Sequence, residues 1–164
     1  MKLPLALDLM NANACLPASK SLIIRQATAD DLPYISTIEQ LTSVNPWSNR
    51  QLNNCLEQSL VLIQEEQLIG FAVVILVEDQ AELHNIAINP QVQGQGLGRF
   101  FLQALIEALP VKIKQLYLEV RVSNYRAIRL YHRMGFSKIA ERKDYYRNGL
   151  GREDAVIMAR NCAT

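Results

Sequence analysis

The spacing of apolar residues predicts several strands in the first half of the chain. Short runs at 22–27, 60–66, 68–78 and 81–89 are rich in Leu, Ile and Val and are bounded by polar residues, which is typical of strands. The last three runs follow one another closely, so short turns between antiparallel strands are the economical arrangement. We therefore expect the middle of the chain to form a mostly antiparallel sheet.

In other segments the apolar residues recur every three or four positions, which predicts helices. These segments cover 27–41, 45–59, 97–109 and 123–135. Pro110 ends the third of them, because proline cannot continue a helix. Polar residues or glycine stand where helix ends are expected, and the predicted caps are Asp30 or Asp31, Ser48, Ser123 or Asn124, and Gly135.

The end of the chain completes a mixed pattern of strands and helices. An apolar strand is expected at 115–122, and 136–159 is expected to form two strands around a polar loop. No repeat or linker interrupts the pattern, so we expect one α/β (α+β) domain over 22–164, with a mixed sheet and about four helices. Residues 1–21 are expected to be a poorly ordered leader, because the apolar run at 3–10 contains a proline and an aspartate and suits neither export nor a membrane span.

Composition and charge argue against several classes of function. The 164 residues are 49% apolar and 20% charged, and the net charge is +1, so no global field attracts nucleic acid or a membrane. The three cysteines lack CxxC spacing and there are only two histidines, so we expect neither a disulfide framework nor a bound metal. Free thiols of this kind indicate a reducing compartment, and we expect a cytoplasmic protein.

The stretch at 89–101, NPQVQGQGLGRFF, has three glycines at alternate positions directly before a predicted helix. A phosphate loop would need a Lys-Ser or Lys-Thr pair, and a dinucleotide-binding turn would need a glycine where Arg99 stands. Two interpretations stay open. One is a plain strand-to-helix turn. The other is a backbone clamp for a pyrophosphate, in which uncovered N–H groups and the positive end of the helix bind the anion.

Gln93, Gly96 and Gly98 form a Q-x-x-G-x-G pattern that resembles the acetyl-coenzyme A loop of the Gcn5-related N-acetyltransferases. The segment LEVRVSNYRAIRLYHRMGF is similar to the second signature of that family. Together with IEQ…NPWS and DYYRNGLGREDAVIMA, these stretches resemble the RimI-type branch, the ribosomal-protein-alanine N-acetyltransferases, over residues 24–159. An additional glycine, Gly94, departs from the commoner loop pattern of the family.

The resemblance implies a fold, a reaction and a cofactor. The sheet would be splayed around a coenzyme A cleft, and acetyl-CoA would be the co-substrate, with no metal. The acceptor would be the N-terminal alanine of a small-subunit ribosomal protein, attacking directly in a ternary complex, and the oligomeric state stays open. An internal lysine or a small-molecule amine remains an alternative acceptor. A non-catalytic acetyl-CoA sensor and a nucleotide-binding protein also remain alternatives.

Attack by an amine requires a base, and departure of the thiolate is helped by an acid. The resemblance implies that Glu119 is the base and Tyr131 the acid. From the residues alone, Glu119 also fits a solvent-facing strand position. Tyr131 likewise fits the apolar face of an ordinary helix.

The resemblance also implies which residues contact the cofactor, namely Ile86, Ala87, Ile88, Gln93, Gly94, Gln95, Gly96, Leu97, Gly98, Arg99 and Asn124. The backbone of 86–88 would pair with the pantetheine arm as an added strand does. As a residue, Asn124 is also explained as a helix cap. Trp47, Tyr145 and Tyr146 are the candidate contacts for the acceptor peptide, although a lone tryptophan equally suits a core.

Overall fold

The computed structural model describes residues 21–149 and 151–162, so nearly all of the predicted leader lies outside the described residues. Contacts divide the chain into two units. The first comprises the described residues up to Val74 together with 85–109, and the second comprises 75–84 and the described residues from Pro110 onward. The strands and α-helices are β1 (Leu22–Gln26), α1 (Leu32–Thr42), α2 (Asn49–Asn54), β2 (Ser59–Gln64), β3 (Gln67–Val77), β4 (Gln80–Ile88), α3 (Leu97–Glu107), β5 (Gln115–Arg121), α4 (Tyr125–Arg133), β6 (Ser137–Asn148) and β7 (Gly151–Asn161).

The strands form the mixed sheet that the sequence predicts. Seven strands are hydrogen-bonded in the order β1-β2-β3-β4-β5-β7-β6. The pairs β1–β2, β2–β3, β5–β7 and β6–β7 are antiparallel, whereas β4 pairs with β5 in parallel, with Gln80–Leu83 opposite Gln115–Leu118. The prediction of one α/β domain with a mostly antiparallel sheet and four α-helices is confirmed.

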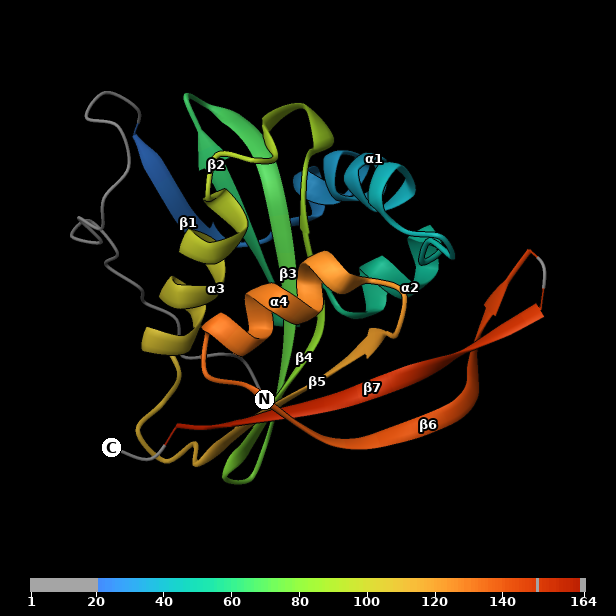
Figure 1. Ribbon diagram of the computed structural model, residues 1–164. Helices are drawn as coiled ribbons and strands as arrows, with labels where there is room; N and C mark the ends of the chain where they lie inside the picture. Colours follow the sequence, from blue (N-terminus) through green and yellow to red (C-terminus); the bar gives the residue numbers. More distant parts are fainter. Residues whose placement is uncertain (1–20, 150, 163–164) are drawn as a thin grey trace. The chain divides into compact units, whose positions relative to one another are not determined.

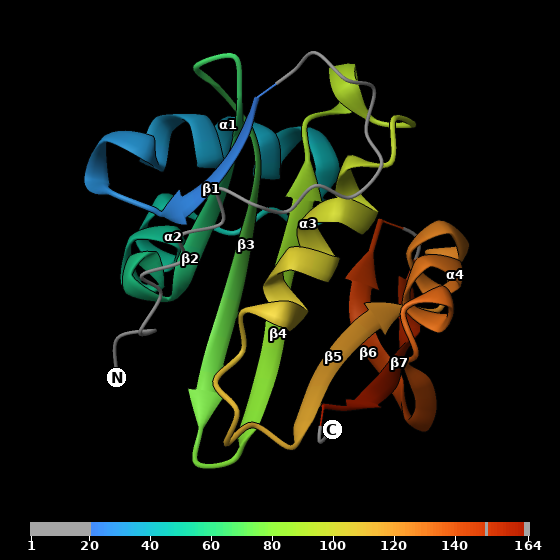
Figure 2. The ribbon, with the colours of Figure 1, turned by 90° about the vertical axis from the view of Figure 1, so that its left-hand side faces the viewer.

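In the first unit, helices cover both faces of the strands β1–β3. Figures 1 and 2 show α1 and α2 on one side and α3 on the other. Alternate strand residues point to opposite faces, so Val61 and Phe71 pack with Ile35 and Leu52 on the α1 and α2 side. The neighbouring residues along these strands, which point to the opposite face, are buried as well. These strands are therefore apolar on both faces, which explains their continuous hydrophobic runs.

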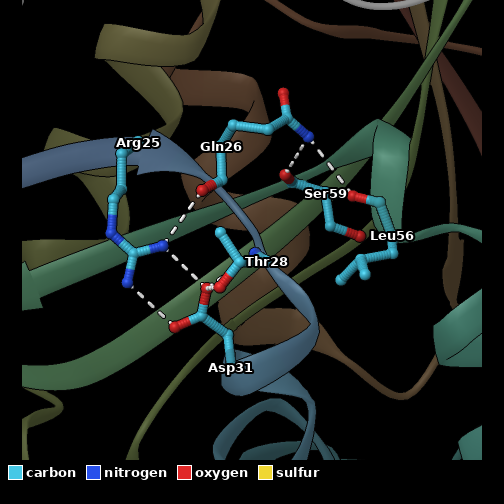
Figure 3. A network of polar contacts seen from close by, with 6 residues as sticks. All are labelled: Arg25, Gln26, Thr28, Asp31, Leu56 and Ser59. Atoms are coloured by element: carbon cyan, nitrogen blue, oxygen red, sulfur yellow. Dashed lines mark hydrogen bonds and ion pairs between the residues drawn. The ribbon is translucent and has the colours of Figure 1, made fainter.

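Asp31 stands at the expected N-cap position of α1, but its side chain binds other groups. Thr28 precedes a short 3-10 turn, and the Asp31 carboxylate accepts hydrogen bonds from the Thr28 backbone N at 2.8 Å and Oγ1 at 3.1 Å. Arg25 binds the same carboxylate at 2.7 and 2.9 Å (Figure 3). Asp31 thus stabilises the turn before the helix and does not cap α1 through its side chain. The Arg25 hydrogen bonds hold the pKa of Asp31 below its usual value.

The other predicted caps are confirmed. Ser48 Oγ accepts from the Gln51 backbone N at the start of α2. Asn124 Oδ1 accepts from the Ala127 backbone N at 3.1 Å at the start of α4. Gly135 has a φ of 83° just beyond the end of α4, a left-handed conformation that favours glycine at this position.

In the second unit, β5 lies between the first part of β4 and strand β7. Its residues alternate between buried Leu116, Leu118 and Val120 and the partly exposed residues between them.

The region expected as a polar loop is mostly strand, because β6 and β7 pair through Asn148 and Gly151 as a long hairpin (Figure 1). The register shifts between Arg142, opposite Ala155, and Tyr146, opposite Glu153, so β6 has two more residues than β7 in this interval, as in an enlarged bulge.

Candidate active site

The glycine stretch forms the connection between β4 and α3 in the first unit. Gly94 and Gly96 have φ values of 83° and 81°, which residues with a Cβ adopt only at a cost. No heavy atom lies within 4 Å of a Cβ built at either position. Two of the three glycines are therefore required by the turn itself, and they leave the outer side of the loop uncovered.

The loop ends directly at the first turn of α3. Gly96 is the N-cap residue, and the Phe100 backbone N donates to its carbonyl oxygen at 3.0 Å. The N–H groups of Leu97, Gly98 and Arg99 belong to the turn that has no partner within the helix. The side chain of Leu97 is buried and anchors the turn. A helix start with these features has the chemistry of an anion site.

The strand segment before the loop is held closely against β3. A Cβ at Gly70 would lie 2.7 Å from Ile88 Cδ1 and 2.8 Å from the Ala87 carbonyl oxygen. The Asn89 backbone N also donates to the Ile69 carbonyl oxygen at 2.8 Å. The side chain of Gln93 folds back and donates through Nε2 to the Ile88 carbonyl oxygen at 2.8 Å. The end of β4 is thus fixed from both sides.

A buried carboxylate in the first unit was not predicted from the sequence. Glu39 lies in α1 and is only 1% exposed. Its Oε1 accepts from the Trp47 backbone N at 3.0 Å, and its Oε2 accepts from Asn85 Nδ2 at 2.9 Å. Glu39 follows Ile35 by four positions on the buried face of α1. An acid within that apolar helical pattern was the signal in the sequence.

In the second unit, Glu119 lies on β5 and forms an ion pair with a residue of β6. Its Oε1 lies 2.8 Å from Arg142 Nη1, and the side chains are 30% and 51% exposed. The Arg142 guanidinium also lies 5.1 Å from the centre of the Tyr145 ring. Glu119 is therefore an accessible, partnered carboxylate. It matches neither a buried group nor a freely solvated strand residue.

Tyr131 is held by the end of α4. The Phe136 backbone N donates to the Tyr131 carbonyl oxygen, and the Gly135 N donates to that of His132, both at 3.0 Å. This is the Schellman arrangement, in which apolar side chains at the same two positions also meet. Accordingly, the Tyr131 and Phe136 rings lie 5.7 Å apart. Tyr131 is 8% exposed, and burial, with a smaller contribution from Tyr146, raises its pKa to about 12.

The two tyrosines of β6 belong to the same group of side chains. Tyr145 and Tyr146 meet edge to face with ring centres 5.0 Å apart. The Arg121 guanidinium lies 4.2 Å from the centre of the Tyr146 ring and forms a 2.7 Å ion pair with Glu153. Burial raises the pKa of Tyr146, and the Glu119 carboxylate adds to that effect. This charge effect indicates that Tyr146 lies near the predicted base.

Neither a metal-binding cluster nor a membrane-spanning helix is found among the described residues. Among the described residues, no group of three or more His, Cys, Asp or Glu side chains is placed to hold a metal ion. Within the same part of the chain, no helix has the length and apolar character needed to cross a membrane.

A comparison with protein families shows which family the chain belongs to. The model of the acetyltransferase (GNAT) family matches residues 23–136, which include the glycine loop, Glu119 and Tyr131. The chain belongs to the GNAT family. It is therefore an acetyl-CoA-dependent N-acetyltransferase, and the expectation drawn from the loop and strand motifs is confirmed.

Individual GNAT relatives indicate which members of the family this chain is similar to. The [ribosomal protein bS18]-alanine N-acetyltransferase of Escherichia coli K12 is 44% identical over 133 residues, covering 79% of this chain and 90% of the relative. The Haemophilus influenzae protein of the same name is 44% identical over 142 residues, covering 84% and 97%. The crystal structure of the ribosomal-protein-S18-alanine N-acetyltransferase from Escherichia coli has a TM-score of 0.82 at 39% identity, covering 88% and 96%.

The GNAT residues predicted from the sequence fall into two sets. Within the second unit, Tyr146 interacts electrostatically with both Tyr131 and Glu119. In the same unit, Tyr145 lies against Arg142, and Asn124 caps α4. Within the first unit, a short 3-10 turn (Pro90–Val92) joins the strand end at 86–88 to the loop at 93–99. Trp47 is joined to this strand through Glu39. Arg142, Arg121 and Glu39 were missed, because each contacts its partner across strands or helices distant in the sequence.

Proposed function

We propose that this GNAT protein transfers the acetyl group of acetyl-CoA to the α-amine of the N-terminal alanine of a small-subunit ribosomal protein. One observation carries the proposal. Two relatives that are 44% identical, and that are covered over nine-tenths or more of their own length, are named for alanine acetylation of ribosomal protein bS18. A protein that modifies nascent or assembling ribosomal proteins acts in the cytoplasm, and that location is part of the proposal.

Glu119 is the proposed base. The acceptor amine reaches the enzyme as an ammonium and cannot attack until a proton is removed, directly or through one water. Glu119 supports this role because its carboxylate is partly exposed and its partner, Arg142, is half exposed on a long side chain. An exposed ion pair of this kind contributes little to stability. The arriving ammonium therefore displaces the guanidinium at small cost and takes its place beside the carboxylate.

Tyr131 is the proposed acid. When the tetrahedral intermediate collapses, the carbon–sulfur bond breaks and its electron pair goes to the coenzyme A sulfur. With a pKa raised to about 12, the Tyr131 hydroxyl is fully protonated at neutral pH and donates its proton to that sulfur. The nitrogen of the intermediate carries one proton more than the product amide, and this proton passes, directly or through water, to the tyrosinate and restores its hydroxyl. Glu119 releases the proton taken from the ammonium to solvent before the next turnover. A thiolate is a good leaving group, so this step requires less assistance than proton removal from the amine.

The glycine loop and the start of α3 are the proposed pyrophosphate site. The supporting features are the open outer side of Gly94 and Gly96 and the first-turn N–H groups of α3. Pairing of the 86–88 backbone with the pantetheine arm and a contact from the Asn124 amide complete the proposed cofactor contacts. Trp47, Tyr145 and Tyr146 are the proposed acceptor contacts.

The test is thiol release from acetyl-CoA with two short peptides. One peptide begins with a free alanine followed by basic residues, and the other is blocked at its N-terminus and carries an internal lysine. Release with the first peptide alone is the expected result, and mass spectrometry should place the acetyl group on the alanine nitrogen.

Other outcomes would redirect the proposal. Release with the blocked peptide alone would move the acceptor to lysine. If neither peptide reacts while coenzyme A binds, a small-molecule amine or a sensing role replaces the ribosomal acceptor.

A further inference from the structure

The Glu39 carboxylate has no evident purpose in the reaction, yet it is among the most buried side chains in the first unit. Its two hydrogen-bond donors, the Trp47 backbone N and Asn85 Nδ2, are both neutral. No lysine or arginine of the described residues forms an ion pair with it. Burying a carboxylate among apolar neighbours costs free energy, which its hydrogen bonds must offset. Leucine or methionine would fill the same space in α1 without that cost, so the two hydrogen bonds of Glu39 call for an explanation.

The two donors belong to segments that differ in how firmly they are otherwise held. Asn85 lies within β4, whose end is fastened to β3 by the Asn89–Ile69 hydrogen bond and the close approach at Gly70. Trp47 lies in the segment 43–48 between α1 and α2, which has no regular secondary structure. Its side chain is partly buried against the core. The carboxylate therefore fastens an irregular segment to a rigid strand.

We infer that Glu39 is a positioning residue that holds the Trp47 segment against β4 in the orientation needed for acceptor binding. This inference rests on the proposed function, in which Trp47 contacts the acceptor peptide. Because β4 keeps its bonds to β3 when Glu39 is changed, the strand and its cofactor contacts stay in place. The Trp47 segment, which has no such ladder, is the part that moves.

A three-variant cycle tests this arrangement. Glu39→Gln places an N–H₂ group against the Asn85 N–H₂ group, so with the Asn85 amide in its present orientation one of the two hydrogen bonds is lost. Asn85→Asp alone places two carboxylates against each other. In the double variant, the introduced amide oxygen accepts from Trp47 N and the introduced amide N–H₂ donates to the new carboxylate. Both hydrogen bonds are then restored with the second reversed in direction.

The expected result is a split between the two substrates. Glu39→Gln should raise KM for the alanine peptide roughly tenfold, with KM for acetyl-CoA within about twofold of wild type. Asn85→Asp should raise the peptide KM at least as much, and the double variant should recover most of the loss. Ile38→Val, a buried change one residue away in α1, is the matched control and should leave both KM values unchanged.

Fluorescence provides a readout that does not depend on turnover. Trp47 is the only tryptophan in the sequence, so indole emission, excited selectively at wavelengths that tyrosine does not absorb, reports on this segment alone. Glu39→Gln should shift the emission maximum to longer wavelength as the ring becomes more hydrated, and the double variant should reverse the shift. Ile38→Val should leave the emission unchanged.

Several outcomes would overturn the inference. One is a peptide KM that changes no more than in Ile38→Val, and another is a KM for acetyl-CoA that rises as much as that for the peptide. A double variant no better than the singles in either readout would also overturn it. If the wild-type protein acetylates only another amine, the proposed acceptor fails, and the fluorescence cycle with KM for that amine still decides whether Glu39 positions Trp47.

Discussion

Glu39 in the first unit and Glu119 in the second are both glutamates held by partners distant in the sequence, but their settings differ. Glu39 is 1% exposed and accepts from two neutral donors on different segments. The Glu119 side chain is 30% exposed and faces a half-exposed guanidinium. The first carboxylate is enclosed and directs its oxygens at fixed groups, whereas the second is open to exchange its partner.

The difference fits the two separate roles proposed for these glutamates. A carboxylate that must exchange protons needs access to a substrate and a partner that leaves easily. A carboxylate that fixes a loop needs burial and directional bonds, because loss of a bond is costly where water cannot replace it. Exposure and partner chemistry, more than position in the sequence, distinguish the proposed base from the proposed positioning residue.

The largest effect should come from removing the exchangeable acid. Glu119→Gln should lower kcat by roughly 10²–10³-fold because proton removal from the ammonium loses its base. KM for acetyl-CoA should stay near the wild-type value. Steady-state thiol release measures both, and Glu141→Gln, an exposed change on β6, is the control. Full activity of Glu119→Gln would remove the contrast between the two glutamates.

Removing the acid that assists thiolate departure should have a smaller effect. Tyr131→Phe keeps the ring packing against Phe136 but removes the hydroxyl, so kcat should fall by roughly 10- to 100-fold. The control is Tyr34→Phe on α1, where the ring is exposed. If Tyr131→Phe changed thermal stability but not kcat, the residue would belong to the core alone.

The glycine loop sharpens the contrast because its proposed role is to bind coenzyme A through the backbone, without side chains. Gly96→Ala places a Cβ at a φ of 81°, which costs about 1–2 kcal/mol and distorts the start of α3. Coenzyme A affinity, measured by calorimetry, should fall roughly tenfold. Gly135→Ala carries the same backbone strain at a φ of 83° beyond α4 and should lower stability without that loss of affinity. Equal losses in both variants would contradict a pyrophosphate site at the loop.

The smallest effect on activity should come from a third carboxylate, Asp31, which has a purely structural setting (Figure 3). Arg25 lowers the pKa of Asp31 in the folded state, so the stabilisation is present above its unfolded pKa and is lost as pH falls through the lower folded value. Asp31→Asn should therefore cost about 1 kcal/mol of unfolding free energy at pH 7. That deficit should shrink on acidification below about pH 4.

Denaturant unfolding at several pH values measures this effect. The exposed neighbour Asp30 offers the control Asp30→Asn. A constant deficit at every pH would mean that packing, and not charge, holds the turn.

Elements with local signals could be predicted from the sequence. The caps at Ser48 and Asn124, the left-handed glycine at Gly135 and the stop before Pro110 all depend on residues within four positions of each other. Asp31 occupies the expected N-cap position of α1, but its side chain makes no capping hydrogen bond to that helix. Arg25 on β1 and the Thr28 backbone bind the Asp31 carboxylate before it can cap α1. The expected polar loop in 136–159 was mostly strand, because pairing between β6 and β7 extends through polar residues.

By itself, the sequence determined the elements, their order, the glycine turn and the motifs of the GNAT family, because backbone preferences act over a few neighbouring residues. Only the tertiary structure decided the partners of the two glutamates. Asn85 is 46 positions from Glu39, and Arg142 reaches Glu119 through the packing of β5, β7 and β6. Which side chains meet across a sheet depends on strand order and register, and these are set by burying the whole set of apolar faces at once.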